Sequence, residues 1–219
     1  MRNMLYYSFY ESEPKKEGFS SVDEGIKAIT KYDFVKQEII QLLQYKLKHI
    51  NFVSKENEYS FECPLDIHCN YSVRQVLAAF DYYNEIKAPT FREGVKYFDD
   101  KKTDVFFINL NKSEKDFSPS TMYEDYAINS TLFHWQTQSG LSDKSDTARR
   151  YIEHNKLQSN ISLFVREYKK TLTHTSSYVF LGNADYVRHE GSKPMSFVWK
   201  LREPIPANLV PNANKSVAI

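Results

Sequence analysis

The sequence predicts an α+β chain in which an N-terminal helical segment precedes a β-barrel. Apolar residues recur at helical spacing through about the first 90 residues, whereas short apolar runs separated by polar turns follow from Arg92 onward. Six or so short strands with few helices are typical of a small closed or nearly closed barrel. We therefore expect two parts, a helical segment at residues 1–90 and a barrel at residues 91–219.

Two helices are predicted in the N-terminal segment. The first begins at Asp33 as its N-cap, and the second begins at Ser72, with Gln75 three residues later as a capping-box partner. The second helix should end at Ala88, because the residue before a proline is pushed out of helical geometry. The first helix presents one apolar face, formed by Phe34, Val35, Ile39, Leu42, Leu43, Leu47 and Ile50.

The barrel strands are predicted from short runs rich in β-branched and aromatic residues. The last run alternates buried-type Met195, Phe197, Trp199 and Leu201 with other residues, as a half-buried strand does. The predicted strands are Val95–Phe98, Val105–Leu110, Leu132–Gln136, Ile161–Glu167, Tyr178–Leu181 and Met195–Leu201.

The composition narrows the classes of function. The chain has 29 Lys+Arg and 28 Asp+Glu, a net charge of +1, which excludes a strongly basic coat that binds DNA without regard to sequence. Two cysteines suggest no disulfide framework and favour a reducing, cytoplasmic location. Cys63, His68 and Cys69 lack a second ligand cluster, so no zinc site is predicted. No glycine-rich phosphate loop and no apolar run of membrane-spanning length occurs.

The stretch from Tyr123 to Gly140 combines a polar aromatic loop with a strand. Tyr123-Glu124-Asp125-Tyr126 is followed by Leu132–Gln136, whose aromatic residues point to alternate faces. From composition alone, Phe133 and Trp135 are core residues and the acidic side chains are solvated.

Several runs resemble one bacterial domain, which lies at the C-terminus of fused phospholipase-D-type nuclease and helicase proteins. They are Leu110–Pro119, Met122–Ile128, Leu132–Gln136, Ile161–Glu167, Phe180–Val187, His189–Met195 and Arg202–Pro206. Over about residues 92–209, with a looser helical part before it, the chain is similar to the C-terminal coupler and SRA-like domain of SauUSI-type ATP-dependent type IV restriction endonucleases. Those enzymes attack DNA that carries 5-methylcytosine or 5-hydroxymethylcytosine.

This resemblance implies an SRA/PUA-like β-barrel that reads modified cytosine and is not itself an enzyme. Its partners would be modified duplex DNA and the helicase and phospholipase-D-type nuclease domains of the parent protein, with no membrane. We expect no cofactor in this chain, because ATP and Mg²⁺ would serve those other domains.

A second resemblance implies the pocket. SRA domains of eukaryotic methylation readers carry a Tyr-acid-acid loop before a strand of the type Phe-Phe-x-Tyr-x-Gly, and Tyr123-Glu124-Asp125 precedes Leu132–Gln136 by similar spacing. Tyr123 and Trp135 would then enclose a flipped base. Asp125, or alternatively Glu124, would accept from the cytosine N4 amino group. Tyr126 would also belong to the pocket, and Thr137 or Gln136 would meet the rest of the base edge.

Basic residues are expected to hold the DNA backbone. Arg149 and Arg150, in a turn-rich connection, are predicted to form a loop that grips phosphates or enters the duplex. The complete set of predicted backbone contacts is Lys112, Lys115, Arg149, Arg150, Arg188 and Lys193.

Two other functions stay open. Asp146, Glu167 and Lys169 match the composition of a metal-dependent nuclease, which needs two carboxylates for the metal and a lysine near the attacking water. A protein-interaction barrel without DNA affinity is the other alternative. The phospholipase-D signature is excluded, because Ile161 stands where an aspartate would follow His154 and Lys156.

Overall fold

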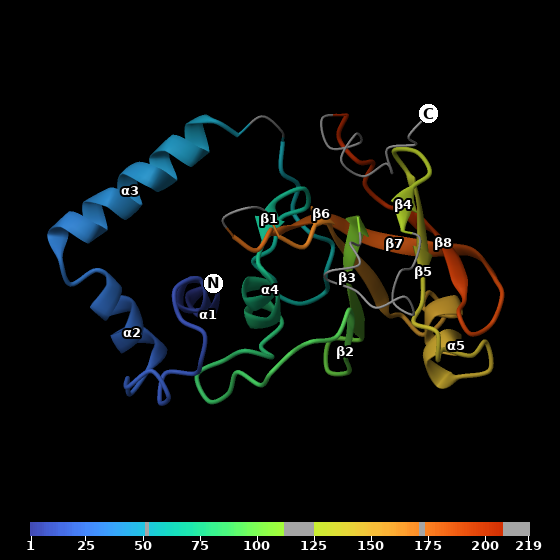
Figure 1. Cartoon of the computed structure of the whole chain (residues 1–219), viewed down its shortest axis with the longest axis horizontal. Coiled ribbons are helices and arrows are strands. Elements are labelled where there is room, and N and C mark those ends of the chain that lie inside the picture. The colour runs from blue at the N-terminus through green and yellow to red at the C-terminus, as the bar shows by residue number, and fades with distance from the viewer. Residues whose placement is uncertain (51–52, 112–124, 171–173, 208–219) are drawn as a thin grey trace.

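A mixed sheet of eight strands organises the computed structural model, which describes residues 1–50, 53–111, 125–170 and 174–207 (Figure 1). The strand order is β2-β3-β6-β7-β8-β5-β4, and β1 pairs with β7. All neighbours are antiparallel except β3 and β6. The strands are β1 Asn70–Tyr71, β2 Val95–Phe98, β3 Thr103–Asn111, β4 Tyr126–Ala127, β5 Leu132–Gln136, β6 Asn160–Tyr168, β7 Tyr178–Glu190 and β8 Ser196–Leu201.

The sheet curls around an interior core. Strands β3 and β5 are four places apart in the strand order, yet the rings of Phe106 and Trp135 lie 4.2 Å apart between centroids. Within the described residues the hydrogen-bonded ladder has its two edges at β2 and β4. In the described parts of the chain, the curl of the sheet is therefore bridged by side chains across its interior and not by hydrogen bonds between β2 and β4. The α+β class is confirmed.

Strands β3 and β6 are buried on both faces and separate two apolar clusters. The inner cluster fills the curl of the sheet, and its larger members are Phe106, Ile108, Leu110, Phe133, Trp135, Tyr151, Leu163, Phe197 and Trp199. The outer cluster lies against the helices, and its larger members are Tyr6, Tyr7, Leu77, Phe80, Phe98, Val105, Phe107, Phe164 and Phe180. The sequence of a strand that is covered on both faces is a continuous apolar run, and Val105–Ile108 is such a run.

Strand β7 bends and so serves both halves of the sheet. Its first part pairs with β6 and β1, and its second part pairs with β8. Gly182 adopts φ +86° at the bend, close to a register shift in the β6–β7 pairing. The sequence predicts that this strand ends at Leu181, but β7 continues to Glu190. Gly182-Asn183 is typical of the end of a strand, but here the register shift is a β-bulge that bends the strand and lets it continue.

Five helices occur in the described residues: α1 Arg2–Tyr7, α2 Val22–Ile29, α3 Asp33–Lys48, α4 Val73–Ala79 and α5 Asp146–Ile152. The predicted capping box of Ser72 and Gln75 is present at the start of α4. The expected end at Ala88 is wrong. Helix α4 stops at Ala79, because Asp81 adopts φ +59° and the amides of Tyr82 and Tyr83 both turn back to the carbonyl of Leu77.

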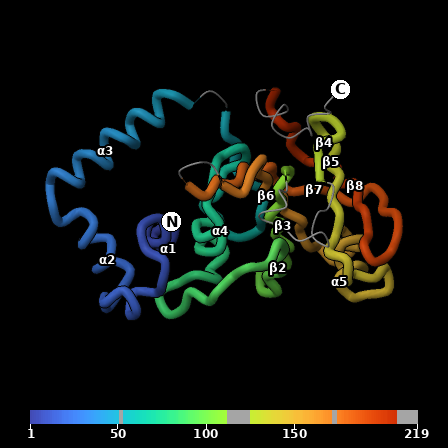
Figure 2. Tube along the Cα trace, in the orientation of Figure 1, coloured from blue at the N-terminus to red at the C-terminus, as the bar shows by residue number. Residues whose placement is uncertain are grey.

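Helix α3 lies away from the sheet (Figures 1 and 2). It begins one residue earlier than expected, with Tyr32 as N-cap and Asp33, the predicted N-cap, as its first residue. None of its residues is buried, and Phe34 and Leu47 on the predicted apolar face are 74% and 72% exposed. Among the described residues, no helix combines the length and apolarity needed to cross a membrane.

A buried polar chain joins the N-terminal part to the sheet. Tyr59 Oη lies 2.7 Å from Ser162 Oγ, which donates to Asn183 Oδ1 at 2.8 Å. Side chains from both predicted parts also meet in the outer cluster, where Tyr6 and Phe80 accompany Phe107 and Phe164. The division at residues 90 and 91 stays a prediction.

Replacing Gly182 should destabilise the fold more than replacing another glycine of equal φ. Gly182 and Gly18 both have φ +86°, but a Cβ at Gly182 would lie 3.1 Å from Ile67 Cδ1, and one at Gly18 would meet nothing within 4 Å. We expect Gly18→Ala to cost about 1–2 kcal/mol of unfolding free energy. Gly182→Ala should cost roughly 1–3 kcal/mol more through overpacking. Denaturant unfolding of both variants measures the difference; equal losses would contradict the crowding at Ile67.

Candidate functional site

A surface cavity of about 420 Å³ lies at the second half of the Tyr123–Gly140 stretch. From that stretch, Trp135, Thr137, Gln138 and Gly140 line it. The other walls come from the β2 region, from β3 and from α5, through Glu93, Tyr97, Asp104, Thr147, Arg150 and Tyr151 among others. We call it the Trp135 cavity. Segments distant in the chain meet here because the sheet curls.

Aromatic residues form one wall. The alternation of β5 turns Phe133, Trp135 and the following Thr137 to the buried face. Trp135 is 7% exposed, and its ring packs against Phe106 at 4.2 Å and against Tyr151 at 5.9 Å in an edge-on contact. Trp135 is therefore both a core residue and a lining residue of the cavity.

An ion pair forms the polar part of the lining. Arg150 donates from Nε to Asp104 Oδ2 at 2.7 Å and from Nη2 to Oδ1 at 2.9 Å. The Asp104 side chain is fully buried, whereas 21% of the Arg150 side chain is exposed. The guanidinium also lies over the ring of Tyr97, 3.9 Å from its centroid. Two contacts thus fix the plane of the guanidinium.

The electrostatics of this pair are set by burial. Burial raises the pKa of Asp104, and the hydrogen bonds and charge of Arg150 lower it, with a net upward shift. Within the described part of the chain, Arg150 Nη1 donates to no protein acceptor. This edge of the guanidinium is therefore available to a ligand that presents acceptors, such as a carbonyl, a ring nitrogen or a phosphate oxygen.

Asp125 and Thr137 are both near Trp135, but only Thr137 lines the cavity. The β4–β5 register, in which Tyr126 pairs with His134, places Asp125 opposite Trp135. Asp125 is 2% exposed, and its Oδ1 accepts the Gln136 amide at 2.9 Å. Thr137 Oγ1 accepts from Met195 N at 3.0 Å and donates to the Gln138 carbonyl. Their predicted roles toward a base stay predictions.

The remaining predicted pocket residues are not brought to this cavity by the described structure. Tyr126 stacks on His134 at 4.7 Å, on the face of β5 opposite to Trp135. Tyr123 and Glu124 lie outside the described residues, as do Lys112 and Lys115 of the predicted backbone contacts.

The loop expected at Arg149 and Arg150 is wrong, because these residues lie on α5. Ser145 caps this helix by accepting the Ala148 amide, and the Ser145-Asp146 signal in the sequence is typical of such a start. Arg149 faces solvent, with 68% of its side chain exposed, whereas Arg150 turns inward to Asp104.

The other two predicted backbone contacts lie along β7 and the turn that follows it. Arg188 is exposed and pairs with Glu190. Lys193 donates its amide to the carbonyl of Leu141, which ties the turn before β8 to the rim of the Trp135 cavity.

The three residues of the nuclease alternative do not share a hollow. Asp146 is 94% exposed on α5 and pairs with Arg149, whereas Lys169 lines a different cavity beyond the end of β6. In the parts of the chain that the structure describes, no group of three or more His, Cys, Asp or Glu side chains gathers in a way that suits a metal ion.

The sequence analysis did not identify Asp104 as a residue of the site. A single acid within the apolar run Thr103 to Leu110 is a recognisable signal, since buried acids need a partner. Its partner Arg150 is 46 residues away. Only the folded chain identifies that pairing.

The fold and this cavity define an α+β domain with a curled mixed sheet and a surface pocket that combines aromatic rings with a buried ion pair. The chain belongs to the family described as "Domain of unknown function (DUF3427)", which matches residues 65–212.

The chain also has similarity to solved structures of other proteins. No curated protein matches the chain. Among solved structures, the crystal structure of KRYPTONITE in complex with mCHH DNA, an H3(1-15) peptide and SAH is similar, with a TM-score of 0.44 and 11% identity. The similarity covers 99% of this chain and 43% of that one, so the chain spans less than half the length of KRYPTONITE.

Removing Arg150 should destabilise the fold through Asp104. Arg150→Gln leaves a buried carboxylate without its partner, which costs about 3–5 kcal/mol. The double variant Asp104→Asn/Arg150→Gln should recover part of that loss. Without Arg150 the folded-state pKa of Asp104 rises further above its unfolded value. Arg150→Gln should therefore gain stability, relative to the double variant, as the pH falls through that folded pKa.

Urea unfolding of both variants at neutral pH and at about pH 5 tests this prediction. The same change in unfolding free energy between the two pH values in the single and the double variant would contradict it.

Proposed function

We propose that this chain is a DNA-recognition module that holds 5-methylcytosine or 5-hydroxymethylcytosine, rotated out of the duplex, in the Trp135 cavity. One observation carries the proposal. The stretch singled out by its resemblance to modified-cytosine readers, through Trp135, Thr137, Gln138 and Gly140, lines a cavity with aromatic and charged walls. Its volume of about 420 Å³ lies within the range of pockets for small ligands.

The chemistry of the walls suits a cytosine. Rotating a base out of the duplex costs a few kcal/mol, and stacking on an aromatic side chain returns roughly 1–3 kcal/mol per base. Cytosine presents two acceptors, O2 and N3, and one donor, N4, on its pairing edge. The outward edge of Arg150 matches the acceptors, and a carboxylate matches N4. As the sequence predicts, we assign that carboxylate to Asp125, which is outside the cavity lining in this structure and would have to turn toward the base, or to Glu124, with Tyr123 as the second aromatic residue beside Trp135.

The modification itself supports only modest selectivity. One buried methyl group contributes about 0.8 kcal/mol by transfer, and pockets discriminate single carbons by roughly 1–3 kcal/mol. We therefore expect the isolated chain to prefer methylated over plain DNA by about tenfold to a hundredfold. Sharper selectivity in a complete enzyme requires a second check, such as cleavage only after two sites are engaged.

We further propose that the chain acts within a type IV restriction endonuclease of the cytoplasm. In this view it recognises DNA and catalyses nothing, while nuclease and helicase domains of the parent protein use Mg²⁺ and ATP. The resemblance of the C-terminal runs to such proteins supports this context.

Titration of labelled duplexes that differ by one methyl group tests the reading function. The full chain should bind the methylated duplex about tenfold or more tightly. Equal affinity for both duplexes, or affinity for neither, would contradict the proposal, and the latter result would favour a protein-interaction barrel. Mg²⁺-dependent nicking by this chain alone would favour a nuclease instead.

Filling the cavity should abolish the preference. Thr147 on α5 lines the cavity, so Thr147→Phe places a ring where the base is proposed to sit. We expect the variant to bind methylated and plain DNA equally, with its salt-sensitive background affinity retained. Thr30→Phe makes the same change at an exposed site at the end of α2 and should keep the preference. A folded Thr147→Phe variant that still prefers methylated DNA would place the base elsewhere.

A further inference from the structure

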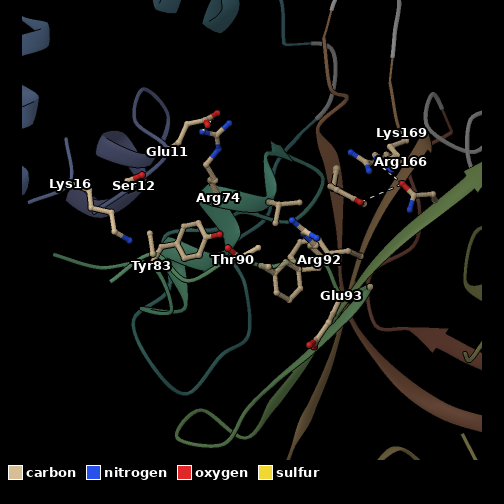
Figure 3. A pocket seen from close by; sticks show the side chains of 17 residues that line it. Glu11, Ser12, Lys16, Arg74, Tyr83, Thr90, Arg92, Glu93, Arg166 and Lys169 are labelled. Carbon is tan, nitrogen blue, oxygen red and sulfur yellow. Dashed lines mark hydrogen bonds and ion pairs between the residues drawn. The ribbon is translucent and has the colours of Figure 1, made fainter. Parts of the chain in front are cut away.

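A second and larger cavity, of about 820 Å³, lies between the helices and the outer face of the sheet (Figure 3). Basic side chains from separate segments line it, and we call it the basic cavity. They are Lys16, Arg74, Arg92, Arg166 and Lys169. Nothing in the sequence patterns singled out this cavity as a site.

The cavity concentrates positive charge in a nearly neutral chain. Its five basic residues face two acidic ones, Glu11 and Glu93, which leaves a net charge of +3. The whole chain carries only +1, so the remaining residues together carry −2. A polyanion is therefore attracted to this cavity rather than to the surface in general.

Arg166 is a rigid part of the cavity. It is 8% exposed, donates from Nε to Asn109 Oδ1 and from Nη1 to the carbonyl of Ser176 at 2.8 Å, and lies 4.2 Å from the ring centroid of Tyr178. These contacts fix the guanidinium in the fold. A ligand that meets it does not have to order a flexible side chain.

The other two arginines, Arg74 and Arg92, can each contact a ligand without the loss of a buried interaction. Arg92 is exposed near the centre of the view in Figure 3, and among the described residues it has no ion-pair partner. Arg74 pairs with Glu11 at 2.8 Å, but the Glu11 side chain is 79% exposed. An exposed pair of this kind contributes little stability, so a phosphate can replace the carboxylate at low cost.

Two features favour a nucleic acid over an acidic peptide. The half-buried ring of Phe91 lies among the basic residues of the lining, beside the buried rings of Tyr83 and Tyr178, and basic side chains next to an accessible aromatic ring are typical of nucleic-acid grooves. The basic cavity also adjoins the Trp135 cavity, since Glu93 lines both, with Gly94 next to it lining the one and Val95 the other. A strand that delivers a base to the Trp135 cavity would therefore pass close to the basic cavity.

We propose that the basic cavity binds phosphate groups of the DNA strand beside the recognised base, with Arg74 and Arg92 as direct contacts and Arg166 as a fixed positive charge. This inference rests on the proposed DNA-binding function. It assigns affinity to the basic cavity and discrimination of the modified base to the Trp135 cavity.

Charge-neutral variants test the proposal in the full chain. Arg92→Gln and Arg74→Gln should each weaken binding equally for methylated and plain duplexes. Each should also lower the slope of log affinity against log salt concentration by about 1. Arg2→Gln removes the same charge from an exposed site on α1 outside the cavity and should leave that slope unchanged. Glu11→Gln removes a competing carboxylate and should strengthen binding of both duplexes.

The outcomes separate this inference from the proposed function. If Arg92→Gln and Arg74→Gln behave like Arg2→Gln while the methyl preference persists, the basic cavity is not a DNA contact and the reading function stands. If the two variants lose affinity and salt dependence but the wild-type chain shows no methyl preference, the cavity assignment stands and the reading function fails. The inference would also be overturned if the wild-type chain bound a polyglutamate peptide and Arg92→Gln and Arg74→Gln lost that binding while their DNA binding was unaffected.

Discussion

The contact between Phe106 and Trp135 holds together strands that are four places apart in the sheet, and the rest of the architecture depends on it. Because the curl brings β3 against β5, the outer faces of β3 and β6 turn toward the helices and collect the second apolar cluster. The same curl brings α5 and the β2 region to the end of β5. Core packing and the Trp135 cavity therefore have one cause, and a change that opens the curl would remove both.

Local signals in the sequence predicted α3, α4 and the longer strands of the sheet, but not α1, α2, α5 or the short strands β1 and β4, and not the assembly of the elements. Ser72 with Gln75 fixed the start of α4, and the alternation in β5 fixed which side chains face inward. The end of α4 depends on the positive φ of Asp81, and the length of β7 depends on the bend at Gly182. Neither composition nor periodicity encodes such backbone geometry. Asp104 with Arg150 is a pairing between distant segments, so the polar wall of the cavity appears only in three dimensions.

In the proposed function, the two cavities divide the requirements of DNA recognition between different kinds of interaction. The Trp135 cavity has a fully buried carboxylate and a guanidinium held flat over Tyr97, which suits short-range selection among ligands. The basic cavity has partly exposed arginines and a local charge of +3, which acts over longer distances and weakens with salt. The segment at Glu93 separates them, so both act on one bound strand in the proposed arrangement.

Helix α3 has a different consequence for the molecule. Its 16 residues bury no side chain, so its hydrogen bonds are supported by little more than helix propensity. In proteins most of the stability of a helix comes from packing of its apolar face rather than from helix propensity. We therefore expect this helix to open and close locally without unfolding of the sheet, and its amide hydrogens to exchange with solvent faster than those of β3 and β6. The helical order of α3 therefore depends on what packs against its apolar face.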